Sequence, residues 1–301
     1  MKILVTGATG LIGSELVSLL LKNNHSVNYL TTSSKKIESK DNYNGFYWNP
    51  TEGKIDENCL LNVDVIVHFA GASIAKRWTQ SYKQELIESR VFSSNLLYNL
   101  LKKHPNQVKH FISASGTAIY PNSYEAIYDE NSTEIEDSFL ANVVVKWEKS
   151  INQFQLLNIK TTKLRTGIVF SNKGGALIEM VRPIKMYVGS GFGSGKQQQS
   201  WIHLTDVAKL YLFVIENQIE GILNAVAPEI ISNQNLTKLI AKICKRPLFL
   251  PNLPEWFMKL ILGEMGSLLF TNKNIKPKKV LELGFEFEFE TTQKALENIL
   301  N

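Results

Sequence analysis

The stretch that decides the fold is MKILVTGATGLIG, residues 1–13. An apolar run is followed by three glycines, and residues 14–22 then carry apolar side chains at helical spacing. A strand, a glycine-rich turn and a helix in this order are typical of dinucleotide-binding folds. In such a turn, Gly7 allows the tight bend, Gly10 lets the backbone approach a pyrophosphate, and Gly13 permits close packing. The helix N-terminus then offers unpaired N–H groups to the anion.

Short apolar runs alternate along the rest of the chain with longer segments of helical periodicity. This alternation predicts right-handed crossovers, and therefore a doubly wound parallel α/β sheet of the Rossmann type. We expect residues 1–170 to form an NADP-binding domain and residues 171–301 a smaller C-terminal α/β lobe. A segment near 200–227 is expected to return to the first domain. The expected strands lie at 3–5, 27–31, 64–70, 108–113 and 159–169, and the expected helices at 14–22, 79–103 and 139–154.

The end of the second strand indicates which dinucleotide is bound. A cofactor with a free ribose usually meets Asp or Glu about 20 residues after the glycines, but here no acid occurs before Glu38. Thr31, Thr32 and Lys35 instead supply donors and positive charge suited to a 2′-phosphate. The sequence therefore favours NADP(H) over NAD(H). In the alternative interpretation these are ordinary loop residues and the cofactor is held elsewhere.

The composition is that of a folded globular protein and limits its partners. The 301 residues carry a net charge of +5, yet Lys and Arg form no block typical of a nucleic-acid arm. No apolar run approaches the ~18 residues of a membrane span. Cys59 and Cys244 have no CxxC spacing, and His203 has no second ligand at metal-binding spacing, so we expect no metal. We expect a cytoplasmic protein with a small-molecule substrate and without a nucleic-acid or membrane partner. Its oligomeric state stays open.

Three motifs resemble the extended short-chain dehydrogenases/reductases: TGATGLIG at 6–13, HFAGASI at 68–74 and SASGTAIY at 113–120. Longer segments, among them RWTQSYKQELIESRV at 77–91 and GSGKQQQSWIHLTDVA at 193–208, resemble an atypical branch of that superfamily. This branch comprises the epimerase family proteins, which are NAD-dependent epimerase/dehydratase-like and sometimes called SulA type. The resemblance covers almost the whole chain. It implies a Rossmann fold, NADP(H) binding and the branch's own C-terminal domain.

The resemblance also implies which residues lie along the cofactor. Relatives usually have Arg at the position of Thr32, and Lys35 is the candidate substitute here. Glu85 and Arg90 would face the cofactor from the long helix, and Val169 would end a strand beside the nicotinamide. The full set of expected contacts is Gly7, Thr9, Gly10, Leu11, Ile12, Thr31, Thr32, Lys35, Phe69, Ala70, Gly71, Glu85, Arg90, Ser113 and Val169.

Arginine is rare in this chain, because only five of the 33 basic residues are Arg. Where Lys is the default, an Arg more often marks a site that needs a planar, forked donor. Arg90 lies in a mostly apolar helix, so we expect it to meet an anion or a carboxylate. The alternative is a structural ion pair with Glu85 or another acid. A structural ion pair is equally open for Arg165.

The catalytic signature of the superfamily is missing. Hydride-transferring members use a Ser or Thr with a TyrxxxLys pair, in which the Tyr serves as acid or base. When Glu148 is aligned with the family's helix Glu, the pair's positions hold Leu140 and Val144. Apolar side chains cannot exchange a proton. The remaining catalytic candidates are Ser115 and Tyr120, followed by Tyr124 and Tyr128 in the next loop.

Two functions therefore stay open. The first is an NADP(H)-dependent, epimerase-like oxidoreductase that acts on an unknown small molecule with a non-standard acid. The second is a nucleotide-binding protein without turnover, which senses NADPH or acts through a partner. Two structural expectations accompany them. His203 and Asp206 are structural or cap groups, with Asp206 preceding a helix as an N-cap. The apolar residues of 256–270 form the core of the lobe rather than a dimer surface.

Overall fold

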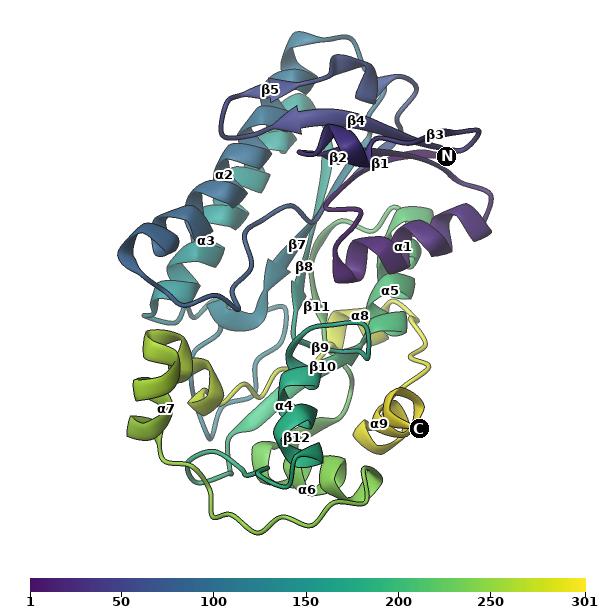
Figure 1. Ribbon diagram of the computed structural model, residues 1–301. Coiled ribbons are helices and arrows are strands. Elements are labelled where there is room, and N and C mark those ends of the chain that lie inside the picture. The colour runs from purple at the N-terminus through teal and green to yellow at the C-terminus, as the bar shows by residue number, and fades with distance from the viewer.

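The computed structural model describes residues 1–301 and contains two β-sheets (Figure 1). The strands of the larger, nine-stranded sheet are β1 (Lys2–Thr6), β2 (Ser26–Thr31), β3 (Ser39–Lys40), β4 (Tyr43–Asn49), β5 (Lys54–Ile55), β6 (Val65–His68), β7 (His110–Gly116), β8 (Lys160–Thr166) and β11 (Gly221–Ala225). Parallel pairing runs through the order β11-β8-β7-β6-β1-β2-β4, and β3 and β5 pair antiparallel with β4. The chain adds strands first on one side of β1 and then on the other. The order in which strands are added therefore reverses between β1 and β6, and open α/β sheets bind their ligands at such a switch point.

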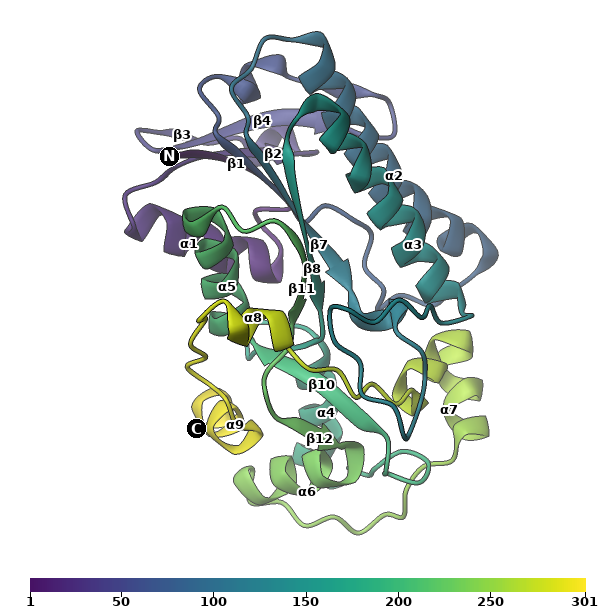
Figure 2. The same ribbon diagram turned by 180° about the vertical axis from the view of Figure 1, so that it is seen from behind.

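Helices cover both faces of this sheet. α1 (Leu11–Lys22) and α5 (Leu204–Asn217) pack together on one face, and α2 (Gln80–Lys103) and α3 (Phe139–Asn152) pack together on the other (Figure 2). Successive residues of β1 point to opposite faces, so Leu4 enters the core under α2 and α3 while its neighbours enter the core under α1 and α5. This double burial explains why the strands read as unbroken apolar runs.

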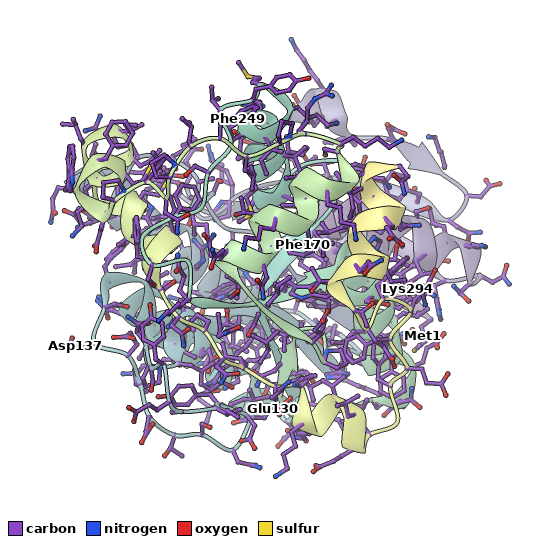
Figure 3. The ribbon with its side chains drawn as sticks, turned by 90° about the horizontal axis from the view of Figure 1, so that it is seen from below. Met1, Glu130, Asp137, Phe170, Phe249 and Lys294 are labelled. Carbon is purple, nitrogen blue, oxygen red and sulfur yellow. The ribbon has the colours of Figure 1, made fainter.

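A second, three-stranded sheet in the C-terminal region has the order β12-β10-β9. Its strands are β9 (Ile168–Phe170), β10 (Gln198–His203) and β12 (Ile230–Ser232). The rings of Phe170 and Trp201 stack 4.9 Å apart in the lobe's core, and Phe170 lies near the centre of the lobe when it is seen from below (Figure 3). The remaining helices are α4 (Ala176–Lys185), α6 (Asn233–Ile243), α7 (Glu255–Leu262), α8 (Lys278–Glu282) and α9 (Thr292–Leu300). Short 3₁₀ helices are η1 (Ser34–Lys36), η2 (Glu57–Leu60), η3 (Thr117–Ile119), η4 (Gln153–Leu157) and η5 (Gly263–Phe270).

The alternating α/β architecture confirms the predicted fold class, but one predicted strand is wrong. Residues 159–169 form two strands, β8 in the large sheet and β9 in the small one. The break falls at Gly167, where an ideal Cβ would lie 2.5 Å from the Ser200 carbonyl oxygen and 2.9 Å from Val226. The chain is thus pressed against β10 at this point and leaves the first sheet. No local pattern encodes that contact, because its partners lie more than 30 residues away.

The expected N-cap role of Asp206 is also wrong. Asp206 is buried inside α5, and its carboxylate accepts hydrogen bonds from the backbone N–H groups of Glu288 and Phe289 at 2.8 and 3.0 Å. The N-cap is His203, whose Nδ1 accepts from the Thr205 N–H at 3.1 Å. Asp206 therefore fastens the C-terminal segment to α5.

The expected burial of residues 256–270 is wrong for the outer face of α7. Trp256 is 68% exposed and Leu260 is 73% exposed, whereas Met258 on the opposite side of the helix is buried. The helix packs through one side only, so its apolar character is not explained by the lobe's core. No helix in the structure is both long enough and apolar enough to cross a membrane.

Candidate functional site

The glycine turn connects β1 to α1 at the carboxyl edge of the sheet. Gly7 adopts a φ of +67°, and the Gly10 N–H donates to the Gly7 carbonyl at 2.9 Å. An ideal Cβ on Gly13 would lie only 2.2 Å from that same carbonyl oxygen, so no larger residue fits there. α1 begins with Gly10 as its N-cap and has no side-chain cap. The N–H groups of the first helical turn are therefore free to bind an anion.

The loop that follows β6 forms the other side of the switch point. The Thr6 hydroxyl oxygen accepts hydrogen bonds from the N–H groups of Phe69 and Ala70, both at 3.1 Å. Phe69 packs edge-to-face on Tyr211 of α5 at 4.7 Å. These contacts hold the backbone of residues 69–71 beside the glycine turn.

His68, at the end of β6, extends this network into α2. Because Thr6 already accepts two N–H groups, its hydroxyl proton donates to His68 Nδ1 at 2.8 Å. His68 Nε2 therefore carries the ring proton and donates to Ser93 Oγ at 3.1 Å, which donates in turn to the Ser89 carbonyl at 2.7 Å. Burial, together with the charge of Arg90, lowers the pKa of His68 to about 3, so the ring is neutral. Sequence reasoning missed His68, although a histidine ending a buried apolar strand was a visible signal.

The end of β2 presents the residues expected beside an adenosine phosphate. Thr31 is buried, and its hydroxyl oxygen accepts the Ser33 N–H at 3.2 Å. Thr32 and Lys35 are exposed, and Lys35 forms no ion pair. The first carboxylate after the strand, Glu38, is paired with Lys40. The end of β2 therefore presents no unpaired carboxylate up to Glu38 that would repel a 2′-phosphate.

The long helix α2 contributes one exposed and one buried candidate. Glu85 is exposed and forms no hydrogen bond or ion pair with Arg90. Arg90 is 8% exposed and forms no ion pair with any carboxylate; its Nη1 and Nη2 donate to the carbonyls of Leu86 and Ala72 at 2.8 and 3.2 Å. Its guanidinium lies 4.9 Å from the centre of the Trp147 ring. Burial lowers the pKa of Arg90 to about 10. The alternative of a structural ion pair for Arg90 is therefore wrong.

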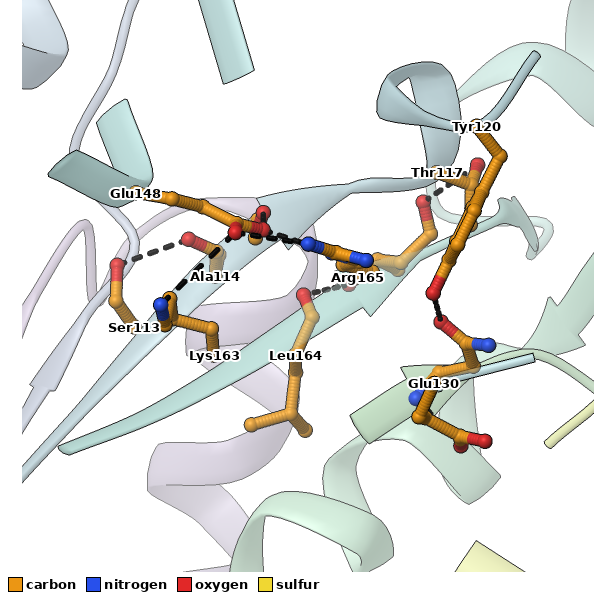
Figure 4. Close-up of polar contacts among 12 residues, drawn as sticks. Ser113, Ala114, Thr117, Tyr120, Glu130, Glu148, Lys163, Leu164 and Arg165 are labelled. Carbon is orange, nitrogen blue, oxygen red and sulfur yellow. Dashed lines mark hydrogen bonds and ion pairs between the residues drawn. The ribbon is translucent and has the colours of Figure 1, made fainter. Parts of the chain in front are cut away.

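Arg165, in contrast, forms a structural ion pair with Glu148, which was one of the two alternatives for this residue (Figure 4). Its Nε and Nη2 donate to the two carboxylate oxygens of Glu148 at 2.8 and 3.0 Å. Burial would raise the pKa of Glu148, but the hydrogen bonds and charge of Arg165, with smaller contributions from Ser115 and Lys163, outweigh it and lower the pKa. Glu148 is thus a buried anion that joins α3 to β7 and β8.

Both catalytic candidates contact this ion pair, Ser115 through Glu148 and Tyr120 through its ring, whose centre lies 4.9 Å from the Arg165 guanidinium (Figure 4). Ser115 Oγ donates to Glu148 at 2.6 Å, and the Tyr120 hydroxyl donates to Asn224 Oδ1 at 2.8 Å. Tyr120 is fully buried, and burial raises its pKa. Both hydroxyl protons are thus held by protein acceptors, and a catalytic role for either residue stays a prediction. Tyr124 is 61% exposed in the following loop.

Leu140 and Val144, which occupy the positions of the family's TyrxxxLys pair, have apolar surroundings in the structure. Val144 is buried, and its Cγ2 lies 3.3 Å from the place of a Cβ on Gly116 at the end of β7. Leu140, one turn earlier, packs with residues of α2 and η5 around Trp78. No ionisable group of α3 therefore reaches the end of β7 from these positions.

Two further expected contacts lie in different sheets, Val169 in β9 of the small sheet and Ser113 in the middle of β7. Val169 is half-buried on β9, while the Ser113 hydroxyl is buried and donates to the Ala114 carbonyl at 2.8 Å. The loop after β9 reaches back to α1, because Lys173 pairs with Glu15 at 2.6 Å. Sequence reasoning did not foresee this contact, which brings residues 171–175 next to the start of α1.

A parallel sheet with an uncapped, glycine-lined helix N-terminus at its switch point defines a dinucleotide-binding α/β protein. The model of the NAD dependent epimerase/dehydratase family matches residues 3–142, and that of a domain of unknown function, DUF1731, matches residues 253–299. The chain belongs to the epimerase family proteins of the extended short-chain dehydrogenase/reductase superfamily, as its motifs predicted.

Relatives match along the full chain. The epimerase family protein SAR0825 of Staphylococcus aureus (strain MRSA252) is 35% identical over 307 residues, covering 99% of this chain and 98% of its own. The epimerase family protein YfhF of Bacillus subtilis (strain 168) is 34% identical, and the match covers 100% of this chain and 98% of YfhF. The crystal structure of the human epimerase family protein SDR39U1 (isoform 2), which contains NADPH, is 27% identical with a TM-score of 0.84, and 99% of each chain is covered. UDP-glucose 4-epimerase of Thermotoga maritima, at 21% identity and a TM-score of 0.79, shares the fold.

The pKa of His68 predicts a pH-dependent stability. The folded-state pKa of about 3 lies below the unfolded value of 6.5. The contribution of neutral His68 to the free energy of unfolding is therefore complete above pH 6.5 and is lost as the pH falls toward 3. At pH 5 the loss is about 2 kcal/mol relative to pH 7.5, from about 1.4 kcal/mol per pH unit. We expect His68→Gln to be less stable at pH 7.5 but to lose less stability between pH 7.5 and 5 in urea unfolding. Parallel pH dependences of the two proteins would contradict this account.

The buried ion pair predicts a large effect of Glu148→Gln. Removing Glu148 leaves Arg165 buried without its carboxylate, and we expect this to lower the free energy of unfolding by about 3–5 kcal/mol. The matched control is Glu179→Gln, since Glu179 pairs with Arg182 at an exposed site and should change stability by less than about 1 kcal/mol. Urea unfolding at neutral pH measures both variants. Equal effects would show that the Glu148 network does not hold α3 to the sheet.

Proposed function

We propose that the protein is an NADP(H)-dependent, epimerase-like oxidoreductase that acts on a small molecule. The observation that carries this proposal is the uncapped N-terminus of α1 beneath the turn of Gly7 and Gly10, at the switch point of the sheet. The NADPH in the human relative's crystal structure supports the same assignment.

The binding residues divide into two groups along the cofactor. The backbone N–H groups of Leu11 and Ile12, at the start of α1, would bind the pyrophosphate, with Thr9 and Gly10 beside it. Thr32 and Lys35 would bind the 2′-phosphate, since both are exposed and no free carboxylate opposes them. The cradle therefore fits a phosphorylated dinucleotide better than one with a free ribose.

The reacting half of the site is the carboxyl edge of β6, β7 and β9. A nicotinamide bound there would supply or accept a hydride, with Val169 beside it. Phe69 and Ala70 would border the adenine and ribose. Because Ser115 and Tyr120 donate their protons to protein acceptors, neither is a free proton donor. A reduction at this site would take its proton from water or from the substrate itself.

A second candidate function is a non-catalytic NADPH-binding sensor. The apolar Leu140 and Val144 favour it, because they leave the end of β7 without the acid–base pair on which hydride-transferring relatives depend. Such a protein would bind the cofactor with the same glycine turn. Only turnover separates the two functions.

Cofactor binding is tested by fluorescence titration with NADPH and NADH. We expect NADPH to bind more tightly, and Gly10→Asp to weaken NADPH binding more than about tenfold, about 1.4 kcal/mol, by placing a negative charge at the pyrophosphate. The matched control, Ser18→Asp, adds the same charge on an exposed turn of α1 and should change affinity less than about threefold. Thr32→Asp should shift preference toward NADH. Failure of both nucleotides to bind the unmodified protein would contradict the proposal.

Turnover is tested by adding a panel of aldehydes and ketones to the NADPH complex and following NADPH absorbance. Oxidation that depends on Gly10 and on the carbonyl compound supports the oxidoreductase. Tight NADPH binding without oxidation by any compound favours the sensor.

A further inference from the structure

Tyr29 of β2 connects the sheet to the segment that carries Lys35. Tyr29 is 1% exposed. Its hydroxyl donates to the Lys36 carbonyl at 2.6 Å and accepts the Glu38 N–H at 2.8 Å. Lys36 ends η1, and Glu38 follows it by two residues. One buried hydroxyl is therefore hydrogen-bonded to two points of the segment between β2 and β3.

The ring of Tyr29 reaches this segment by crossing the neighbouring strand β4. In the parallel pairing of β2 with β4, Tyr29 lies opposite Gly45, and an ideal Cβ on Gly45 would be only 2.5 Å from Cζ and from the hydroxyl oxygen of Tyr29. The ring also stacks on Tyr43 of β4, with 4.4 Å between the ring centres. Because a side chain at position 45 would block this path, the glycine of β4 and the tyrosine of β2 act together.

The segment has little else to hold it in place. η1 comprises only Ser34–Lys36 and has no side-chain hydrogen bond at its N-cap. Residues 34–38 are all exposed, so none of their side chains packs in the core. A 3₁₀ helix this short has poor hydrogen-bond geometry of its own. The position of the segment therefore depends on backbone hydrogen bonds to the sheet, and Tyr29 supplies two of them.

η1 also carries two positive charges that no carboxylate neutralises. Lys35 and Lys36 are exposed, and neither forms an ion pair. A 2′-phosphate at the end of β2 would lie beside this turn, whereas a free ribose would not need it. A binding surface that is ordered in advance loses less conformational entropy on binding. Holding η1 in place should therefore favour NADPH and leave the affinity for NADH unaffected.

We propose that Tyr29 is a positioning residue for the cofactor's 2′-phosphate. Its hydroxyl holds η1 so that Lys35 and Lys36 meet that phosphate, which strengthens the preference for NADP(H) over NAD(H). This inference rests on the proposed NADP(H) site and extends it to a residue behind the binding surface. Tyr29 is buried and acts only through the turn.

The hydroxyl is tested by Tyr29→Phe, which keeps the ring and its stacking. We expect the dissociation constant of NADPH, measured by fluorescence titration, to rise about fivefold or more, about 1 kcal/mol, while that of NADH stays within about twofold. Tyr98→Phe is the matched control, because Tyr98 packs on Phe154 on the opposite face of the sheet. The control should change neither affinity. Melting temperatures verify that each variant folds.

A double-mutant cycle with Lys35 tests whether Tyr29 acts through the turn. Because Lys35 is exposed, Lys35→Gln should leave the fold intact. We expect Lys35→Gln to weaken NADPH binding about fivefold in the unmodified protein but less than about twofold when Tyr29→Phe is already present. Effects of the two substitutions that simply multiply would show that the hydroxyl does not position Lys35, and would overturn the inference.

The remaining outcomes separate this inference from the proposed function. Equal weakening of NADPH and NADH binding by Tyr29→Phe would give the hydroxyl a purely structural role. Unchanged NADPH affinity would show that the turn keeps its position without the hydroxyl. Either result overturns the inference and leaves the NADP(H) site standing. If the unmodified protein binds neither nucleotide, the proposed function and this inference both fail.

Discussion

The site depends on the contact between the turn after β1 and the start of α1. The Gly7 carbonyl lies so close to α1 that a single Cβ at Gly13 would reach within 2.2 Å of it. The helix begins after Gly10, and because this N-cap residue has no side chain, the first N–H groups of α1 have no side-chain cap. Thr6, immediately before the turn, then fixes the neighbouring loop by accepting two of its N–H groups. Two loops at the switch point are thereby held by one short stretch of sequence, and the remainder of the sheet provides the support that keeps β1 and β6 in register.

The parts of this structure that sequence predicts are those with a local cause. The glycine turn, the buried strands and the long helices follow from spacing and periodicity. The division of residues 159–169 between two sheets does not, because the steric cause at Gly167 comes from Ser200 and Val226. The role of Asp206 was mispredicted for the same reason, since its partners lie 82 and 83 residues away. At the site, sequence marked Arg90 as unusual, but only the structure shows that no carboxylate accompanies it.

The polar network around Glu148 and the apolar face of α3 lead to one conclusion about chemistry. Glu148 accepts hydrogen bonds from the Ser115 hydroxyl and from Nε and Nη2 of Arg165, so these groups hold α3 on the sheet. Leu140 and Val144 supply no proton-exchanging group. Arg90 is held between α2 and α3 by the carbonyls of Leu86 and Ala72 and by the Trp147 ring. Under the proposed function, a reduction at this site would take its proton from water or from the substrate.

The central claim is that the carboxyl edge between β1 and β6 binds a phosphorylated dinucleotide. The most direct measurement is a crystal structure of the protein grown with NADPH. We expect pyrophosphate density within hydrogen-bond distance of the N–H groups at the start of α1 and a 2′-phosphate beside Thr32 and Lys35. A nucleotide bound elsewhere, or one whose 2′-phosphate points away from the end of β2, would contradict it.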